Sequence, residues 1–368
     1  MDTLLLNLRA DVADITEQLV NVPSISGDEA TLADAIQVEL ANCDWLEVNR
    51  IANTVIAKTN FGLPMRVVLA GHLDTVPGAN NTTAMRISAG GELPTGEVVA
   101  EEVIFGLGSC DMKAGVAVVL KTAVTLRDPN VDVTYIFYEC EEVEGTRNGL
   151  TLVSNTAPEL LAADVAVLLE PSNAVIEAGC QGTLRAEITT KGIRAHSARS
   201  WHGKNAIHAL APALEILANF SPDRVLIDGL EYREGLNAVG ICGGVAGNVI
   251  PDSASLTVNY RYAPSVSAEQ AQARITSIFA GFDVEIVDNV PGALPGLREP
   301  ALANLLAQVG EDVLPKFGWT DVSRFSRLGI PAVNLGPGNP NLAHSASEHV
   351  PVSQIHRTAD LITQWLTK

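Results

Sequence analysis

The spacing of hydrophobic residues predicts two helices at the start of the chain. Apolar residues recur at helical spacing over residues 4–19, and Pro23 ends this first helix. Ser26 and Glu29 stand three residues apart before a second apolar stretch, which predicts a capping box and a helix to about Ala41. Apolar runs then predict buried strands at 66–70, 133–138 and 163–169, with a helix at 113–126. Strands that alternate with helices indicate a largely parallel sheet covered by helices.

From about residue 179 the pattern changes to a βαββαβ order, which is that of a ferredoxin-like unit. We expect strands at 183–193, 236–245, 254–262 and 284–288, and helices at 205–220 and 268–280. After a glycine- and proline-rich stretch at 291–296, a helix, a short strand at 332–335 and a helix at 353–366 resume the first pattern. We therefore predict an α/β domain of residues 1–178 and 290–368, interrupted by an α+β domain of residues 179–289.

Composition supports this organisation and excludes some partners. A chain of 368 residues is longer than one hydrophobic core usually serves, and 47% hydrophobic with 18% charged residues is typical of a folded protein. The formal net charge of −19 argues against binding to nucleic acid or to an anionic membrane surface. An anionic substrate would therefore need local positive charge within its site.

The cysteines and the N-terminal segment indicate the compartment. The five cysteines are scattered and form no CxxC pair, which argues against a disulfide framework and fits a reducing cytoplasm. Charged residues interrupt the apolar ones in residues 1–20, so we expect no signal peptide. No run approaches about 18 apolar residues, so we expect no membrane span. The cysteines are Cys43, Cys110, Cys140, Cys180 and Cys242.

His72 and Asp74 follow the first predicted strand at its carboxyl end, where open α/β sheets hold ligands. Residues two apart in an extended chain point the same way, so the Asp74 carboxylate can orient the His72 ring. By itself this pair could equally be a loop histidine beside a turn aspartate.

Four further segments carry polar side chains beside strand or helix ends. Asp111 precedes the helix at 113–126; alone it could be a cap, and the glycines at 106 and 108 lack the third glycine of a dinucleotide fingerprint. Glu141 and Glu142 follow a buried strand, where paired carboxylates are costly unless a metal or proton neutralises them. Glu170 ends another apolar strand, and a glycine- and proline-rich loop presents His344. Together these residue types form a plausible oxygen and nitrogen ligand set for a pair of zinc ions.

The order and local context of these segments resemble the two-zinc metallopeptidase and deacylase family. This family includes aminoacylase, acetylornithine deacetylase, carboxypeptidase G and succinyl-diaminopimelate desuccinylase. The resemblance covers essentially the whole chain, and it implies a zinc-exopeptidase-like mixed sheet with helices on both faces. It also implies that the inserted ferredoxin-like domain is a lid through which two subunits form a homodimer.

The resemblance assigns roles by position. It implies two Zn²⁺ per subunit, with Co²⁺ able to substitute, and a cis peptide after Asp111. Glu141 would be the general base that moves a proton from water to the leaving amine, assisted by Asp74, and His196 would stabilise the oxyanion across the dimer. The implied metal ligands are His72, Asp111, Glu142, Glu170 and His344, and the implied substrate contacts are Asn248, Arg261, Thr320 and Arg324.

Within the family, residues 138–150 and 200–208 look most like the succinyl-diaminopimelate desuccinylases. The expected reaction is hydrolysis of N-succinyl-LL-2,6-diaminopimelate, a small anionic N-acyl amino acid that arginines suit as anchors. The loop at 318–321 departs from the usual form of that enzyme. An acetylornithine deacetylase, another deacylase or dipeptidase, and a non-catalytic binding relative remain alternatives.

Overall fold

The computed structural model describes residues 4–78, 81–310 and 313–367, and the chain divides into two compact units. The first unit contains Met1–Ala178, Gly296–Leu314 and Arg324–Lys368, and the second contains Gly179–Pro295 and Pro315–Ser323. Residues 290–295 and 315–323, which the sequence assigns to the α/β domain, thus group with the inserted part. Within the described residues, no helix has both the length and the apolar character needed to cross a bilayer.

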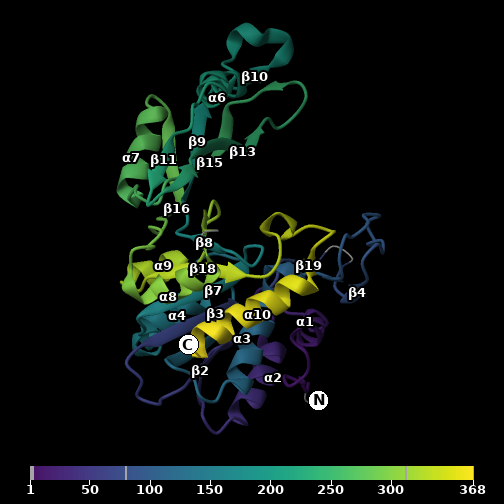
Figure 1. The fold of residues 1–368 in the computed structure, drawn as a ribbon. Coiled ribbons are helices and arrows are strands. Elements are labelled where there is room, and N and C mark those ends of the chain that lie inside the picture. Colours follow the sequence, from purple (N-terminus) through teal and green to yellow (C-terminus); the bar gives the residue numbers. More distant parts are fainter. Residues whose placement is uncertain (1–3, 79–80, 311–312, 368) are drawn as a thin grey trace. The chain divides into compact units, whose positions relative to one another are not determined.

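An eight-stranded mixed sheet forms the first unit, in the order β1-β2-β6-β3-β7-β18-β8-β17 (Figure 1). The central strands β6, β3, β7 and β18 run parallel, whereas β1, β2 and β8 pair in antiparallel fashion. The strands are β1 (Glu47–Ile51), β2 (Thr54–Lys58), β3 (Arg66–His72), β6 (Asp132–Tyr138), β7 (Val165–Pro171), β8 (Ile176–Ala178), β17 (Val313–Pro315) and β18 (Ala332–Gly336). A smaller sheet joins β4 (Met85–Ile87), β5 (Val103–Phe105) and β19 (His349–Pro351).

Both faces of the central strands are covered. Every residue of β6 and of β7 is buried, which requires packing on both sides of the sheet. Helix α3 packs on β3 and β7 beside α1 and α10, and α2 packs on β1 and β2 (Figure 1). These observations confirm the predicted α/β class with a mixed, helix-covered sheet. The helices are α1 (Val12–Val20), α2 (Ala30–Ala41), α3 (Ala114–Thr125), α4 (Gly149–Thr156), α8 (Ala303–Val309), α9 (Val322–Arg327) and α10 (Val352–Thr367).

Two expectations at the N-terminal end are wrong. The first helix begins at Val12 and not near residue 4, because the Asp11 side chain accepts a hydrogen bond from the Ala13 N–H and caps the helix there. The predicted capping box is absent, since the helix at Ala30 has no side-chain cap. The Ser26 hydroxyl instead donates to the Asp74 carboxylate 2.7 Å away.

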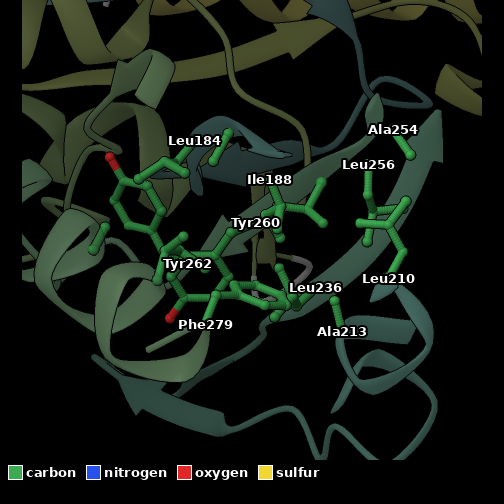
Figure 2. Close-up of a cluster of buried hydrophobic side chains, with 14 of the residues drawn as sticks. Leu184, Ile188, Leu210, Ala213, Leu236, Ala254, Leu256, Tyr260, Tyr262 and Phe279 are labelled. Atoms are coloured by element: carbon green, nitrogen blue, oxygen red, sulfur yellow. The ribbon is translucent and has the colours of Figure 1, made fainter. Parts of the chain in front are cut away.

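The second unit contains the predicted βαββαβ order. Its antiparallel sheet has the order β13-β15-β9-β16, and alternate residues of β9 and β15 are buried. Those residues pack with the helices in the core drawn in Figure 2. The predicted helix at 205–220 is split at Leu210, where Pro212 follows, and a hairpin of β11 and β12 was not predicted. The elements are β9 (Gly182–Lys191), α5 (Ala206–Ala209), α6 (Ala211–Ala218), β11 (Arg224–Ile227), β12 (Leu230–Arg233), β13 (Gly235–Gly243), β15 (Ser253–Tyr262), α7 (Ala268–Ile278) and β16 (Asp283–Val290).

Close contact between α3 and β7 predicts that Gly115 cannot be replaced by a larger residue. A Cβ at this position would lie 2.1 Å from the Leu169 carbonyl oxygen, so Gly115→Val must displace helix from sheet. We expect Gly115→Val to lower the free energy of unfolding by about 1–3 kcal/mol, measured by urea denaturation. Gly247→Ala, where no atom lies within 4 Å, is the control. Equal stability of the two variants would contradict the close approach.

Candidate active site

The parallel strands bring the predicted ligands together at one edge of the sheet, because parallel strands present their carboxyl ends on the same side. Ligand atoms of His72, Asp111 and Glu170 lie within 4.8 Å of one another. Ligand atoms of Asp111, Glu142 and His344 satisfy the same limit, so Asp111 belongs to both groups. His72 ends β3, Glu170 lies in β7, and Asp111 lies in the short helical segment Ser109–Lys113 before α3. The Asp111–Met112 peptide is cis, as expected.

The His72 ring is oriented by main chain and faces a carboxylate. Its Nδ1 lies 2.9 Å from the Asp74 carbonyl oxygen, and because that oxygen only accepts, Nδ1 carries a hydrogen. Nε2 then lies 3.1 Å from Asp111 Oδ1, where a bare lone pair would face a negative oxygen. Burial alone would lower the pKa of His72, but hydrogen bonding to Asp111 and the charge of Asp74 raise it well above its ordinary value. A proton or a metal cation is needed between the two groups.

His344 has the same requirement in the second group. Its Nε2 lies 2.7 Å from Glu142 Oε1 and 3.4 Å from Asp111 Oδ2. Hydrogen bonding to Asp111 and to Glu142 raises the pKa of His344 to about 10. Three carboxylates thus surround two imidazoles, a donor set that suits divalent cations with mixed nitrogen and oxygen ligands. The residues present therefore fit a metal pair that shares Asp111.

The Asp74 carboxylate contacts the acidic loop more closely than it contacts His72. Oδ1 lies 3.5 Å from His72 Nδ1, whereas it accepts a hydrogen bond from the Glu141 N–H at 2.9 Å. Oδ2 accepts from the Glu142 N–H at 3.0 Å and from Ser26 Oγ at 2.7 Å. The expectation that this carboxylate orients the histidine is therefore incomplete: the carbonyl of Asp74 holds His72, and its carboxylate holds Glu141 and Glu142.

Glu141 lies beside the clusters, as a general base would. One of its carboxylate oxygens lies within 4.8 Å of ligand atoms of both His72 and Glu142. The Glu141 side chain is only partly buried, so it can reach solvent, while its main chain is tied to Asp74. Its chemical role remains a prediction.

Four of the other predicted residues lie in the second unit. His196 in β10 (Ala195–His196) pairs with Val249 in β14 (Val249–Ile250), and its Nδ1 accepts from the Ala198 N–H at 3.0 Å. Asn248 is adjacent, since its carbonyl accepts from Ser197 N–H. Arg261 in β15 donates to Asn259, and Thr320 is buried in this unit rather than in the first. These residues remain predictions as oxyanion and substrate contacts.

Arg324 lies in the first unit but outside the ligand clusters. Arg324 lies in α9 and donates a hydrogen bond to the hydroxyl group of Thr151 in α4. Its guanidinium group also lies close to Gly145. With Asn155 and Phe325 it lines a cavity of about 200 Å³. Its predicted substrate contact remains untested.

Two buried residues near the clusters were not among the predicted catalytic, metal-binding or substrate-binding residues. Glu348 Oε1 accepts hydrogen bonds from the Cys110 and Asp111 N–H groups, each at 3.0 Å, and burial raises the pKa of Glu348 to about 7. Lys113 Nζ donates to the Val22 carbonyl at 2.7 Å, and burial lowers the pKa of Lys113 to about 7. In the sequence, Glu348 stands four residues after His344, and this short spacing is a signal that it lies near the site.

Comparison with known proteins decides the family. Residues 68–368 match the peptidase family M20/M25/M40. The chain belongs to this family. Membership in M20 confirms the resemblance drawn from the sequence and the expectation of a hydrolase.

Two similar proteins align with nearly the whole chain. A Mycobacterium tuberculosis protein assigned as a succinyl-diaminopimelate desuccinylase is 48% identical over 98% of this chain and 99% of its own. The succinyl-diaminopimelate desuccinylase of Corynebacterium glutamicum is 45% identical over 99% of this chain and 98% of its own.

Two solved structures share the fold. A tripeptidase from Staphylococcus aureus superposes with a TM-score of 0.77 at 20% identity, covering 98% of each chain. The YXEP protein of Bacillus subtilis, described as a dinuclear metal-binding peptidase of family M20, superposes with a TM-score of 0.64 at 18% identity, covering 96% of each chain. At these identities, the likeness supports the architecture alone.

The contacts of Asp74 predict a pH-dependent contribution to stability. Burial would raise the pKa of Asp74, but His72 and the hydrogen bonds from Glu141 and Ser26 lower it from 3.8 to about 2. A lowered folded-state pKa stabilises the protein above pH 4, and this stabilisation is lost as the pH falls through about 2. The lowered pKa of Asp74 corresponds to a contribution of about 2 kcal/mol to the free energy of unfolding.

In chelator-treated protein, we therefore expect Asp74→Asn to lower the free energy of unfolding by about 2 kcal/mol at pH 7, with a smaller difference below pH 3. Urea denaturation at several pH values measures it, and Asp28→Asn, at an exposed position, is the control. A difference between Asp74→Asn and wild type that is independent of pH would contradict the assignment.

Proposed function

We propose that this chain hydrolyses the amide of N-succinyl-LL-2,6-diaminopimelate to succinate and LL-2,6-diaminopimelate. The main support for amide hydrolysis is the presence of two clusters of histidine and carboxylate side chains that share Asp111, with Glu141 beside them. The choice of substrate is supported by the two relatives at 45% and 48% identity, which carry this activity in their names. The alignments span 98% or more of this chain and of both relatives, so the similarity is not confined to a shared fragment.

We propose a pair of zinc ions in the two groups, with Co²⁺ as a substitute. His72 and Glu170 would hold one ion, Glu142 and His344 the other, and Asp111 would bridge them. When bound, such cations supply Lewis acidity at the amide carbonyl and lower the pKa of water. The support is the donor chemistry, the two imidazoles that require a cation or proton, and a family relative described as dinuclear.

The protein residues would then divide the proton transfers and the orientation of the substrate. Glu141 would take a proton from the attacking water and deliver it to the leaving amine. Asp74 would keep Glu141 and Glu142 in place through their main chain. Proton transfer requires the Glu141 carboxylate to stay within hydrogen-bond distance of the water and of the leaving amine. A fixed main chain at Glu141 would help to keep the carboxylate at that distance.

The second unit would supply contacts to the substrate. We propose that His196 stabilises the oxyanion and that Asn248, Arg261 and Thr320 bind the substrate, with Arg324 as a further anchor. Arginines suit a substrate with several carboxylates, particularly in a chain of net charge −19. A homodimer formed through this unit and a cytoplasmic location belong to the same proposal.

The activity is tested by comparing substrates with zinc-loaded protein. We expect kcat/KM for N-succinyl-LL-2,6-diaminopimelate to exceed that for N-acetylornithine and for a simple dipeptide by about 100-fold or more, roughly 2.7 kcal/mol in transition-state binding. Preference for acetylornithine would retain the reaction and change the substrate. Hydrolysis of none of the three would support a non-catalytic binding protein.

The ligand assignment predicts a pattern of metal occupancy. We expect Asp111→Asn to lose both ions, and Glu170→Gln to lose one, because Glu170 belongs to a single group. Glu141→Gln is the matched control: it should keep two ions while kcat falls by about 10²–10⁴-fold. Metal content by mass spectrometry after dialysis measures this, and loss of metal from Glu141→Gln would make Glu141 a ligand.

A further inference from the structure

Three consecutive main-chain amides of the acidic loop donate to two buried carboxylates. The N–H groups of Glu141 and Glu142 donate to Asp74, as described above. The preceding N–H group, that of Cys140, donates to Oε1 of Glu29 at 3.1 Å. Glu29 has no part in the ligand clusters, yet it holds the residue directly before Glu141.

The main chain at Cys140 needs such support. Cys140 has a φ of 56°, a left-handed conformation that is unfavourable for a residue with a side chain. This turn lies where the chain leaves β6 and directs Glu141 toward His72. Hydrogen bonds on both sides of the turn maintain a conformation that the isolated loop would rarely adopt.

Glu29 is placed for this contact and not for an ion pair. Its side chain is fully buried, and Oε1 also accepts from the Gly27 N–H at 2.8 Å and from Cys140 Sγ at 3.4 Å. Oε2 has no hydrogen-bond partner, and no lysine, arginine or histidine among the described residues pairs with Glu29. The carboxylate therefore acts here as a hydrogen-bond acceptor for the loop.

The segment that carries Glu29 is joined to the other site loop as well. The Ser24 hydroxyl donates to the Leu73 carbonyl at 2.7 Å, and Ser26 Oγ donates to Asp74 Oδ2. Residues 24–29 thus contact both the loop of Asp74 and the loop of Glu141. A displacement of this segment would change both positions together.

We infer that Glu29 is a positioning residue for Glu141, which it fixes through the Cys140 amide. The inference rests on the proposed function, because it takes Glu141 as the base. It requires an acceptor oxygen at the position of Oε1, and it does not require the negative charge of Glu29.

A cation site is the competing explanation, since ligand atoms of Glu29, Glu139 and Cys140 lie within 4.8 Å of one another. The contacts favour positioning, because Glu29 Oε1 is already engaged by two amides and a thiol. A cation site would depend on the negative charge of the Glu29 side chain, whereas positioning of the loop would depend on the length of that side chain.

The test compares Glu29→Gln with Glu29→Asp. Glutamine keeps the acceptor oxygen in place without the charge, whereas aspartate keeps the charge and withdraws the oxygen by one methylene. We expect kcat of Glu29→Gln within about 3-fold of wild type and kcat of Glu29→Asp lower by about 10–100-fold, with KM and bound metal unchanged in both. Asp28→Asn, the exposed neighbour, is the matched control.

Hydrogen exchange gives a readout that does not depend on turnover. Peptides that contain residues 139–142 should exchange faster in Glu29→Asp than in wild type or Glu29→Gln, with an unchanged unfolding midpoint. Reduced kcat of Glu29→Gln together with normal kcat of Glu29→Asp would overturn the inference in favour of a cation site. Exchange rates unchanged from wild type in both variants would also overturn the inference, because the Glu29 contact would then not hold the loop. A wild type that hydrolyses no substrate while the exchange difference persists would refute the proposed function alone.

Discussion

The hydrogen bonds from the Glu141 and Glu142 amides to the Asp74 carboxylate are the interaction on which the arrangement of the site depends. They tie the end of β6 to the end of β3, so two strand ends act as one unit. Burial makes this linkage strong, because a buried carboxylate must be satisfied by donors and a buried amide by acceptors. The same aspartate orients His72 through its carbonyl oxygen. Asp74 thus positions His72, a proposed ligand at the end of β3, and both Glu142 and the proposed base Glu141, which follow β6.

The charge of the site follows from the same geometry. Asp111, Glu142 and Glu170 gather at the sheet edge with two histidines, and nearby Glu348 is buried behind the Asp111 main chain. An assembly with this excess of negative charge is stable only when protons or cations balance it. The raised pKa values of His72 and His344 express this demand. In the proposed reaction, bound cations would reverse the local charge, which would allow an acidic chain to bind an anionic substrate.

The predicted functional residues are divided between the two units. The first unit holds the ligand clusters and Glu141, whereas His196, Asn248, Arg261 and Thr320 lie in the second. In the proposed reaction, metal-assisted hydrolysis therefore belongs to the mixed sheet, and much of the recognition of the acyl amino acid belongs to the ferredoxin-like sheet. Under this proposal, changes in the second unit would alter the substrate preference while the hydrolytic groups stay the same.

The sequence by itself determined the fold class, the central strands of the two main sheets and the residues that gather in the clusters. The strand ends could be identified because β6 and β7 are buried on both faces and appear in the sequence as continuous apolar runs with carboxylates at their carboxyl ends. Tertiary structure decided the contacts between segments far apart in the chain. Ser26 and Glu29 have the spacing of a capping box, but their side chains contact Asp74 and Cys140, which lie 48 and 111 residues away. Local spacing cannot reveal such partners, because a buried polar group binds whatever donor or acceptor the folded chain brings to it.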